Sequence, residues 1–387
     1  MKIITFYLPQ FHEIPENNEW WGKGFTEWVN VKKAKPLYDG HYQPRVPLND
    51  NYYNLLDDCT KKWQVDLAKK YGIYGFCFYH YWFNGKLLLE KPVEQFLNNK
   101  DLDIHFCLSW ANEPWTNGWV AGKNAKVLIS QRYGDKKEWK EHFEYLLPFF
   151  QDQRYIKHNG KPLFVLYKVD IVPRLNEMLD YFQELAVEAG LPGISFAYQH
   201  LFNNELAMDD DSRFDLNIHY EPIYVYRDST YQKNKWIRDI KRKISHFLVQ
   251  HTNINIERVS KTQKLIKVDY DEMWDLILKR RPVSEKCVPG AFVDWDSTSR
   301  RVERGKVYEG ATPEKFQRYL SGQINRSKNV FKKDMLFLFA WNEWAEGGYL
   351  EPDERYRHGY LEAVRNALEE NNEFPNYSIN HISTKGK

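Results

Sequence analysis

Residues 335–353 read MLFLFAWNEWAEGGYLEPD. The first six residues are apolar, enough for one buried strand, and the run ends abruptly in two acids, Glu343 and Glu346, flanked by Trp341 and Trp344. Acid–base chemistry on a sugar needs one carboxyl group that holds a proton and one that does not, and desolvation by indole rings can separate two pKa values in this way. The plainer alternative is a strand end with two solvated acids. We identify Glu343 and Glu346 as candidate catalytic residues.

Seven further short apolar runs resemble this one. They are Ile3 to Leu8, Gly75 to Tyr79, Ile104 to Trp110, Pro162 to Tyr167, Ile194 to Tyr198, Leu216 to Tyr220 and Ala291 to Trp295. Most of the intervals carry apolar residues at helical spacing, and Thr312 with Pro313 predicts the start of one helix. Eight strands alternating with helices predict an α/β fold, a closed (β/α)8 TIM barrel forming a single domain over 1–387. A doubly wound open sheet is the alternative, but no glycine-rich phosphate loop follows any run.

Two segments do not fit the simple repeat. Residues 9–53 form a long first loop, and residues 231–282 predict a helical insertion before the seventh strand. Within the insertion, residues 233–250 (KNKWIRDIKRKISHFLVQ) place apolar side chains on one helical face and Lys and Arg on the other. Such a helix suits peripheral contact with an acidic membrane surface. The alternative is a helix that packs on the core with a solvated basic face.

Composition excludes some classes of partner. The 387 residues include 55 basic and 53 acidic side chains, a formal net charge of +2, so no whole-chain field favours nucleic acid. Aromatic residues make up 16%, and such rings stack on the apolar faces of sugars, although a large aromatic core would also account for them.

The 4 cysteines form no CxxC pair, and the first apolar run has no cleavage site for a signal peptide. These features predict a cytoplasmic protein.

In a barrel the carboxyl ends of the strands converge on one mouth. Here those ends and the first loop are rich in aromatic, amide, His and acidic residues, as expected of a site for a polyhydroxylated ligand. A lone histidine at one strand end would more often be structural. We predict that the glycan contacts Tyr7, Gln10, His12, His41, Tyr79, His80, Tyr81, Trp82, Trp110, Asn112, Glu113, Trp115, His200, His219, Tyr220, Glu221, Asp294, Trp295, Arg300, Trp341 and Asn342.

Other chemistries find little support. The sequence has no HExxH, HxH, GxSxG or nucleotide-binding glycine motif. His12, His80, His200 and His219 could meet in space around a metal, but no close ligand spacing supports this. We therefore expect no catalytic metal.

The motif WNEWAEG at 341–347 resembles the signature of glycoside hydrolase family 99, the endo-α-mannosidases. The wider pattern is similar to the WbsX-like branch found in surface-polysaccharide gene clusters, through FYLPQFH (6–12), GFTEW (24–28), GHYQPRVPL (40–48), FCFYHYWF (76–83), LSWANEPW (108–115) and LEPD (350–353). The resemblance implies a barrel without a cofactor in which Glu343 acts as a base on the sugar's own 2-hydroxyl. Glu346 would protonate the leaving oxygen and then activate water. The mannosidases usually carry His where this chain has Ala345, which leaves mannose specificity open.

Asn112-Glu113-Pro114 offers a second assignment, because it resembles the acid-bearing motif of many retaining barrel glycosidases. Glu113 would then be the acid and Glu343 the nucleophile, with carboxyl groups roughly 5–5.5 Å apart. That motif normally follows a fourth strand, whereas Glu113 follows the third run. We favour Glu343 with Glu346, and Glu113 as a substrate-binding carboxylate.

Three functions follow from this reading. The first is a retaining hydrolase of an α-linked, mannoside-like glycan of bacterial surface polysaccharide. The second is a glycosyltransferase of O-antigen or capsule biosynthesis, and the third is a non-catalytic glycan-binding barrel. The sequence leaves the linkage, endo or exo action and the oligomeric state open.

Overall fold

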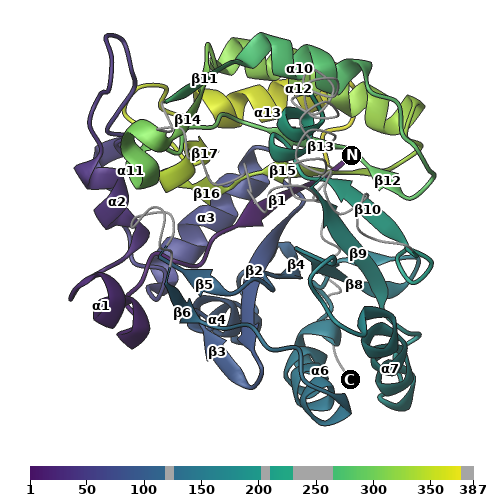
Figure 1. Ribbon diagram of the computed structural model, residues 1–387. Helices are drawn as coiled ribbons and strands as arrows, with labels where there is room; N and C mark the ends of the chain where they lie inside the picture. The colour runs from purple at the N-terminus through teal and green to yellow at the C-terminus, as the bar shows by residue number, and fades with distance from the viewer. Residues whose placement is uncertain (118–125, 202–209, 230–264, 376–387) are drawn as a thin grey trace, which may run out of the picture.

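The structure, a computed structural model, describes residues 1–117, 126–201, 210–229 and 265–375. Its centre is a parallel sheet whose strands follow the order β12-β10-β9-β8-β4-β2-β1-β15-β13 (Figure 1). Their bounds are β1 (Lys2–Tyr7), β2 (Gly75–Phe83), β4 (His105–Trp110), β8 (Lys161–Leu166), β9 (Ser195–His200), β10 (Leu216–His219), β12 (Cys287–Val288), β13 (Gly290–Phe292) and β15 (Met335–Phe339). All eight apolar runs of the sequence lie on these strands, so the barrel prediction is confirmed.

The barrel closes through its seventh strand, which is divided between two neighbours. β12 pairs with β10, and β13 pairs with β15. Pro289 separates the two halves, since proline has no N–H to give to a ladder, while its carbonyl oxygen accepts a bond from the Phe337 N–H at 3.2 Å. At Gly290 a Cβ atom would lie 1.8 Å from the His219 carbonyl oxygen, so the strands can approach this closely only at glycine.

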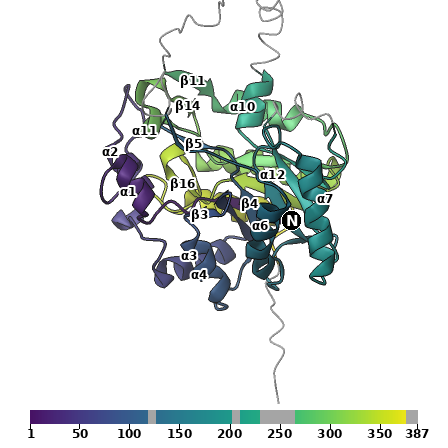
Figure 2. The ribbon, with the colours of Figure 1, turned by 60° about the horizontal axis from the view of Figure 1, so that its bottom comes forward.

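Helices surround the sheet (Figures 1 and 2). The long ones are α3 (Asp58–Lys70), α4 (Lys91–Asn98), α6 (Lys136–Phe150), α7 (Leu175–Glu188), α10 (Tyr270–Lys279), α12 (Pro313–Asn329) and α13 (Gly359–Glu370). The predicted start of α12 is confirmed, because the Thr312 side chain caps the helix by accepting a bond from the Lys315 N–H. With helices on its outer face, the sheet is buried on both sides, as parallel sheets require.

Shorter elements lie mainly in the loops above the strand ends. They are α1 (Pro15–Trp21), α2 (Glu27–Lys33), η1 (Leu48–Asp50), β3 (Lys86–Leu88), β5 (Trp115–Thr116), β6 (Val127–Ile129), β7 (Lys157–His158), β11 (Ile266–Asp269), α11 (Thr298–Arg301), η4 (Val302–Arg304), β14 (Lys306–Glu309), β16 (Asn342–Glu343), η5 (Trp344–Glu346) and β17 (Gly348–Tyr349). The long first loop thus holds two α-helices, α1 and α2, and the short 3-10 helix η1.

The predicted insertion at 231–282 is only partly described. Residues 231–264, including the basic segment 233–250, lie outside the described residues. The remainder is not helical throughout, because β11 precedes α10 and pairs with β14 in a separate two-stranded sheet. Within the described ranges, no helix is both long and apolar enough to cross a membrane.

Candidate active site

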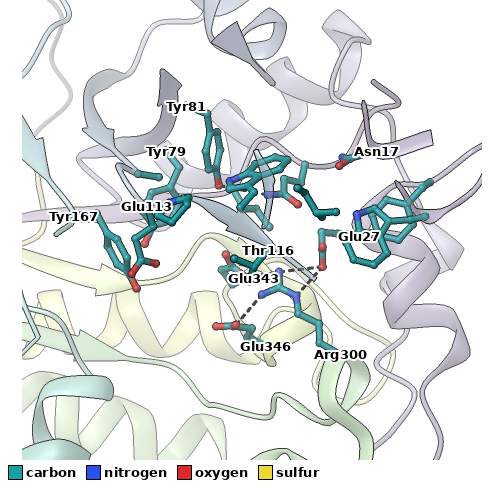
Figure 3. Close-up of a pocket in the computed structure, with 18 of the residues that line it drawn as sticks. Asn17, Glu27, Tyr79, Tyr81, Glu113, Thr116, Tyr167, Arg300, Glu343 and Glu346 are labelled. Carbon is teal, nitrogen blue, oxygen red and sulfur yellow. Dashed lines mark hydrogen bonds and ion pairs between the residues drawn. The ribbon is translucent and has the colours of Figure 1, made fainter. Parts of the chain in front are cut away.

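A cavity of about 330 Å³ opens at the carboxyl ends of the barrel strands (Figure 3). Its wall contains aromatic rings, four carboxylates and two guanidinium groups. The lining residues are Leu8, Gln10, Asn17, Trp21, Phe25, Glu27, Tyr79, Tyr81, Ala111, Glu113, Pro114, Trp115, Thr116, Leu128, Tyr167, Tyr220, Arg300, Arg301, Glu343 and Glu346. Both candidate catalytic acids therefore face the same cavity.

The segment after β15 folds into a tight hairpin that presents these acids. β16 and β17 pair antiparallel, with Glu343 opposite Gly348, and the 3-10 turn η5 between them ends at Gly347. Gly347 has a φ of 68°, a conformation that favours glycine. Asn342 anchors the hairpin to the first strand end, since its side chain bonds both the N–H and the carbonyl of Leu8, at 2.8 and 3.0 Å.

Arg300 connects three carboxylates at the centre of the cavity (Figure 3). Its guanidinium lies 2.7 Å from Glu346 Oε1, 3.0 Å from Glu27 Oε2 and 3.4 Å from Glu343 Oε2. Glu27 comes from α2 in the first loop, so this cluster joins the first, seventh and eighth loops of the barrel. Three negative charges against one positive charge leave the cluster with a net negative charge when all are ionised.

The two candidate catalytic acids differ in how deeply they are buried. Burial raises the pKa of Glu343 to about 8. The charge of Arg300 acts against this rise, whereas the neighbouring carboxylates of Glu346 and Glu27 add to it. Burial alone would lower the pKa of Arg300, but the carboxylates hold it well above its usual value, so the guanidinium stays charged. The Glu343 side chain is 7% exposed and that of Glu346 is 22% exposed, so Glu346 is the more accessible to water.

A second polar network lies behind Arg300 and fixes its loop. Asp296 accepts bonds from His41 Nε2 at 2.9 Å, from Gln43 Nε2 at 2.8 Å and from the Thr298 N–H at 2.9 Å, where α11 begins. Its own N–H donates to the carbonyl of Glu346 at 2.6 Å. This main-chain bond ties the loop after the seventh strand directly to the turn that carries Glu346.

Tyrosines and Glu113 form the opposite wall (Figure 3). The hydroxyls of Tyr79 and Tyr220 are 2.8 Å apart, and Tyr167 packs edge-on against both rings. Glu113 pairs with Lys168 at 3.1 Å and its side chain is 42% exposed. Such a wall offers ring faces for stacking and hydroxyl groups for hydrogen bonds, which suits a sugar.

The structure brings nine of the predicted site residues together around this cavity: Gln10, Tyr79, Tyr81, Glu113, Trp115, Tyr220, Arg300, Glu343 and Glu346. It places the other predicted residues outside the cavity wall: Tyr7, His12, His41, His80, Trp82, Trp110, Asn112, His200, His219, Glu221, Asp294, Trp295, Trp341 and Asn342. These residues instead make contacts within the protein.

Several of them face the surrounding helices. His80 Nε2 lies 2.9 Å from His142 Nε2 on α6, and Trp82 stacks on the same ring at 4.7 Å. His200 and His219 pack against the ring of Tyr224, with centroids 4.6 and 4.8 Å away. Within the described residues, no three His, Cys, Asp or Glu side chains are placed to hold a metal ion.

Others join buried polar pairs. Tyr7 donates to Gln64, Asp294 pairs with Arg45 at 2.9 Å, and Glu221 pairs with Arg280. Asn112 forms hydrogen bonds with the main chain of Lys168, and Asn342 with the main chain of Leu8. His41 forms a hydrogen bond with Asp296. Three tryptophans make contacts inside the protein: Trp110 Nε1 donates to the Trp82 carbonyl, Trp295 packs on Phe339, and Trp341 packs on Phe76. His12 is buried, and burial lowers its pKa to about 4.

Eleven residues of the cavity wall are absent from the predicted set: Leu8, Asn17, Trp21, Phe25, Glu27, Ala111, Pro114, Thr116, Leu128, Tyr167 and Arg301. Phe25 and Glu27 belong to the quoted motif GFTEW, so their signal was visible but was not attached to any strand end. Tyr167 closes the fourth apolar run and was available from the same rule that selected the other strand ends.

The barrel fold, with a mouth lined by tyrosines and carboxylates, indicates a carbohydrate-active enzyme. The sequence model of the family described as "Glycosyltransferase WbsX" matches residues 3–364. The chain belongs to this family, and the predicted relationship is confirmed. A relative, the uncharacterized protein WxcX of Xanthomonas campestris pv. campestris strain B100, is 32% identical over 375 residues, covering 95% of this chain and 49% of the relative. The chain thus spans about half the length of the curated relatives it matches.

Solved structures agree on the fold. The GH99 endo-alpha-mannosidase from Bacteroides thetaiotaomicron in complex with BIS-TRIS-propane is 13% identical, with a TM-score of 0.53 over 95% of this chain and 96% of the other. A "Glycoside hydrolase-like protein" is 10% identical, with a TM-score of 0.55 over 95% of this chain and 93% of the other. At these identities the likeness establishes the barrel fold alone.

Proposed function

We propose that this chain is a retaining glycoside hydrolase that cleaves an α-linked, mannoside-like glycan of bacterial surface polysaccharide. The observation that carries the proposal is the pairing of Glu343 and Glu346 across Arg300 in one cavity, with unequal burial of the two acids. The tyrosine wall opposite supplies the surface for the sugar ring.

In the proposed reaction, Glu343 takes the proton from the sugar's 2-hydroxyl, whose oxygen attacks the anomeric carbon. Glu346 donates a proton to the departing glycosidic oxygen as that bond breaks, leaving a 1,2-anhydro sugar. Glu346 then takes a proton from water, which opens the anhydro ring at the anomeric carbon, and Glu343 returns its proton to O2. Two inversions give net retention, and the internal nucleophile needs no separate positioning.

The environments of the two acids support these roles. A sugar hydroxyl is weakly acidic, so its base works better when its own pKa is raised, as burial does for Glu343. Glu346 is the more exposed of the two, as expected of a group that must meet a leaving group and then water. Arg300 stays charged between them and can stabilise whichever acid is ionised.

Glu113 is assigned to substrate binding. It lies on the tyrosine wall, away from Arg300 (Figure 3), where it pairs with Lys168 and is more exposed to solvent than Glu343. A carboxylate in that position can accept bonds from sugar hydroxyls.

The test is the release of reducing sugar from α-linked oligosaccharides without any nucleotide donor. We expect Glu346→Gln and Glu343→Gln to lower kcat by at least about 100-fold while glycan binding persists, since removal of a general acid or base typically costs this much. Glu141→Gln, an exposed change on α6, serves as the control and should be neutral. Turnover that survives Glu346→Gln would remove this residue from the mechanism.

A glycosyltransferase is the second candidate, favoured by the description of the family to which the chain belongs. The same cavity would then pass the sugar to another hydroxyl instead of to water. Activity that appears only when a nucleotide sugar is supplied would replace the hydrolase proposal with this one.

A further inference from the structure

Three cationic side chains gather beside Glu346 and take no part in the proposed reaction. Arg301 follows Arg300 at the end of α11 and lines the cavity. Lys306 opens β14, and Arg227 belongs to the helical residues 223–229 that follow β10. The charge of Lys306 interacts with those of Arg227, Arg301 and Glu346, so the cations are neighbours of Glu346, and Arg301 joins them to the cavity wall.

The fold holds the three cations in place. Ser297 and Lys306 close the base of a loop through two bonds of 3.0 Å, from the Ser297 N–H to the Lys306 carbonyl and from the Lys306 N–H to Ser297 Oγ. Arg301 lies within this loop. Lys306 Nζ sits 3.0 Å from the ring centroid of Tyr226, and the next residue, Arg227, donates to the Leu201 carbonyl at 3.0 Å.

Within the described part of the chain, these charges have no carboxylate partner of their own. Among the described residues, no carboxylate forms an ion pair with Arg227, Arg301 or Lys306, and the nearby Glu346 is already paired with Arg300. Burial, with the positive charges of Arg227 and Arg301, lowers the pKa of Lys306 to about 7. Holding the partly buried Lys306 ammonium beside two other cations is unfavourable, and a bound anion would offset this cost.

We propose that Arg227, Arg301 and Lys306 form a subsite for a phosphate or diphosphate group carried on the leaving-group side of the substrate. The choice of side rests on the proposed role of Glu346, the acid whose charge interacts with that of Lys306. A phosphate ester carries about two negative charges and several acceptor oxygens, so it matches three cations better than a single uronate carboxylate does. The substrate is then a phosphorylated glycan or a glycosyl diphosphate.

The probe is inorganic pyrophosphate, titrated calorimetrically into the whole protein near pH 6, where Lys306 is charged. We expect the unaltered protein to bind it, and Arg301→Ala or Lys306→Ala to weaken binding about tenfold or more, the loss of one charge-assisted contact. Arg301 is exposed, so its replacement should leave folding intact. Lys279→Ala, an exposed cation on α10, is the matched control and should bind as before.

Two further ligands identify the source of the phosphate. Tighter binding of uridine diphosphate than of pyrophosphate indicates a nucleotide leaving group, and tighter binding of geranyl diphosphate indicates a lipid carrier. If pyrophosphate does not bind at millimolar concentration, or binds equally well to Arg301→Ala (an adventitious ion only), the subsite is refuted. Turnover of a neutral oligosaccharide by Glu346→Gln would refute the proposed function instead, and the titrations do not depend on that result.

Discussion

Replacing Glu343 by Gln should stabilise the protein at alkaline pH. The carboxyl group is buried beside two other carboxylates, and burial raises its pKa from the usual 4.5 to about 8. Above pH 8 the folded protein must therefore hold a desolvated negative charge that the unfolded chain exposes to water. A glutamine side chain has nearly the same shape and stays neutral, as the protonated acid does, so it avoids this cost.

The size of the effect follows from linkage. Between pH 4.5 and 8 the folded protein binds this proton and the unfolded chain does not, so the free energy of unfolding falls as pH rises. Each pH unit over this interval corresponds to 1.36 kcal/mol, which gives a total of about 5 kcal/mol. The contribution of the protonated group is fully present below pH 4.5 and is lost above pH 8. The Gln variant should thus match the original protein in acid and exceed it by about 5 kcal/mol in alkali.

Urea denaturation of both proteins between about pH 5 and pH 9 measures this difference directly and needs no substrate. The control is Gln10→Ala, which alters the same cavity without removing a titratable group, and its difference from the original protein should not vary with pH. A Glu343→Gln difference that is also constant across this range would refute the raised pKa and, with it, the argument that burial prepares this acid for its role.

Three other outcomes follow from the geometry. In the proposed hydrolase, kcat/KM should rise with pH through about 8 as Glu343 ionises, and a fall there would make Glu343 the acid instead. Gly347→Ala should lower the free energy of unfolding by about 2–3 kcal/mol, because a Cβ atom would lie 2.9 Å from a main-chain nitrogen. The control is Gly160→Ala, which has a similar φ of 78° but nothing within 4 Å of the added Cβ atom. It should cost only about 1 kcal/mol in the same denaturation assay. Gln64→Leu should cost about 2–4 kcal/mol, since it removes a 2.7 Å bond to the buried Glu351, whereas a loss below 0.5 kcal/mol would show that this bond is unimportant.

The barrel itself was predictable because parallel strands buried on both faces leave a plain signal of apolar runs. The division of the seventh strand was not. Cys287 and Val288 form too short a run to be recognised, and Pro289 after them argues against a strand when only local sequence is considered. The bend becomes intelligible only when β10 and β15 are known to lie on either side of it.

The site prediction gathered too many residues because it ignored the alternation of side chains along a strand. On β2, Tyr79 and Tyr81 face the cavity, whereas His80 and Trp82, which alternate with them, face α6. The same alternation separates Glu343 in the cavity from Asn342 at the first strand end. Applying the period of two to each strand end would have removed several of these residues from the prediction.

Glu27 shows the opposite difficulty. It lies in a long loop and accepts a hydrogen bond from Arg300, which is 273 residues further along the chain. Nothing in the local sequence around Glu27 indicates that these two residues meet. Only the folded chain shows that the first loop crosses the mouth and supplies a third carboxylate. Loop residues of this kind are found from sequence through their motif, here GFTEW, and not through periodicity.

The cavity wall has two parts that are held together in different ways. One part holds Arg300 and both acids on a framework whose members share their hydrogen bonds, so a change to any one disturbs the rest. The other consists of rings and Glu113 from β2, β4 and β8, which meet mainly through side chains. In the proposed hydrolase, the second part can therefore be altered with less disturbance than the first, so a redesign of sugar specificity should begin with the tyrosines.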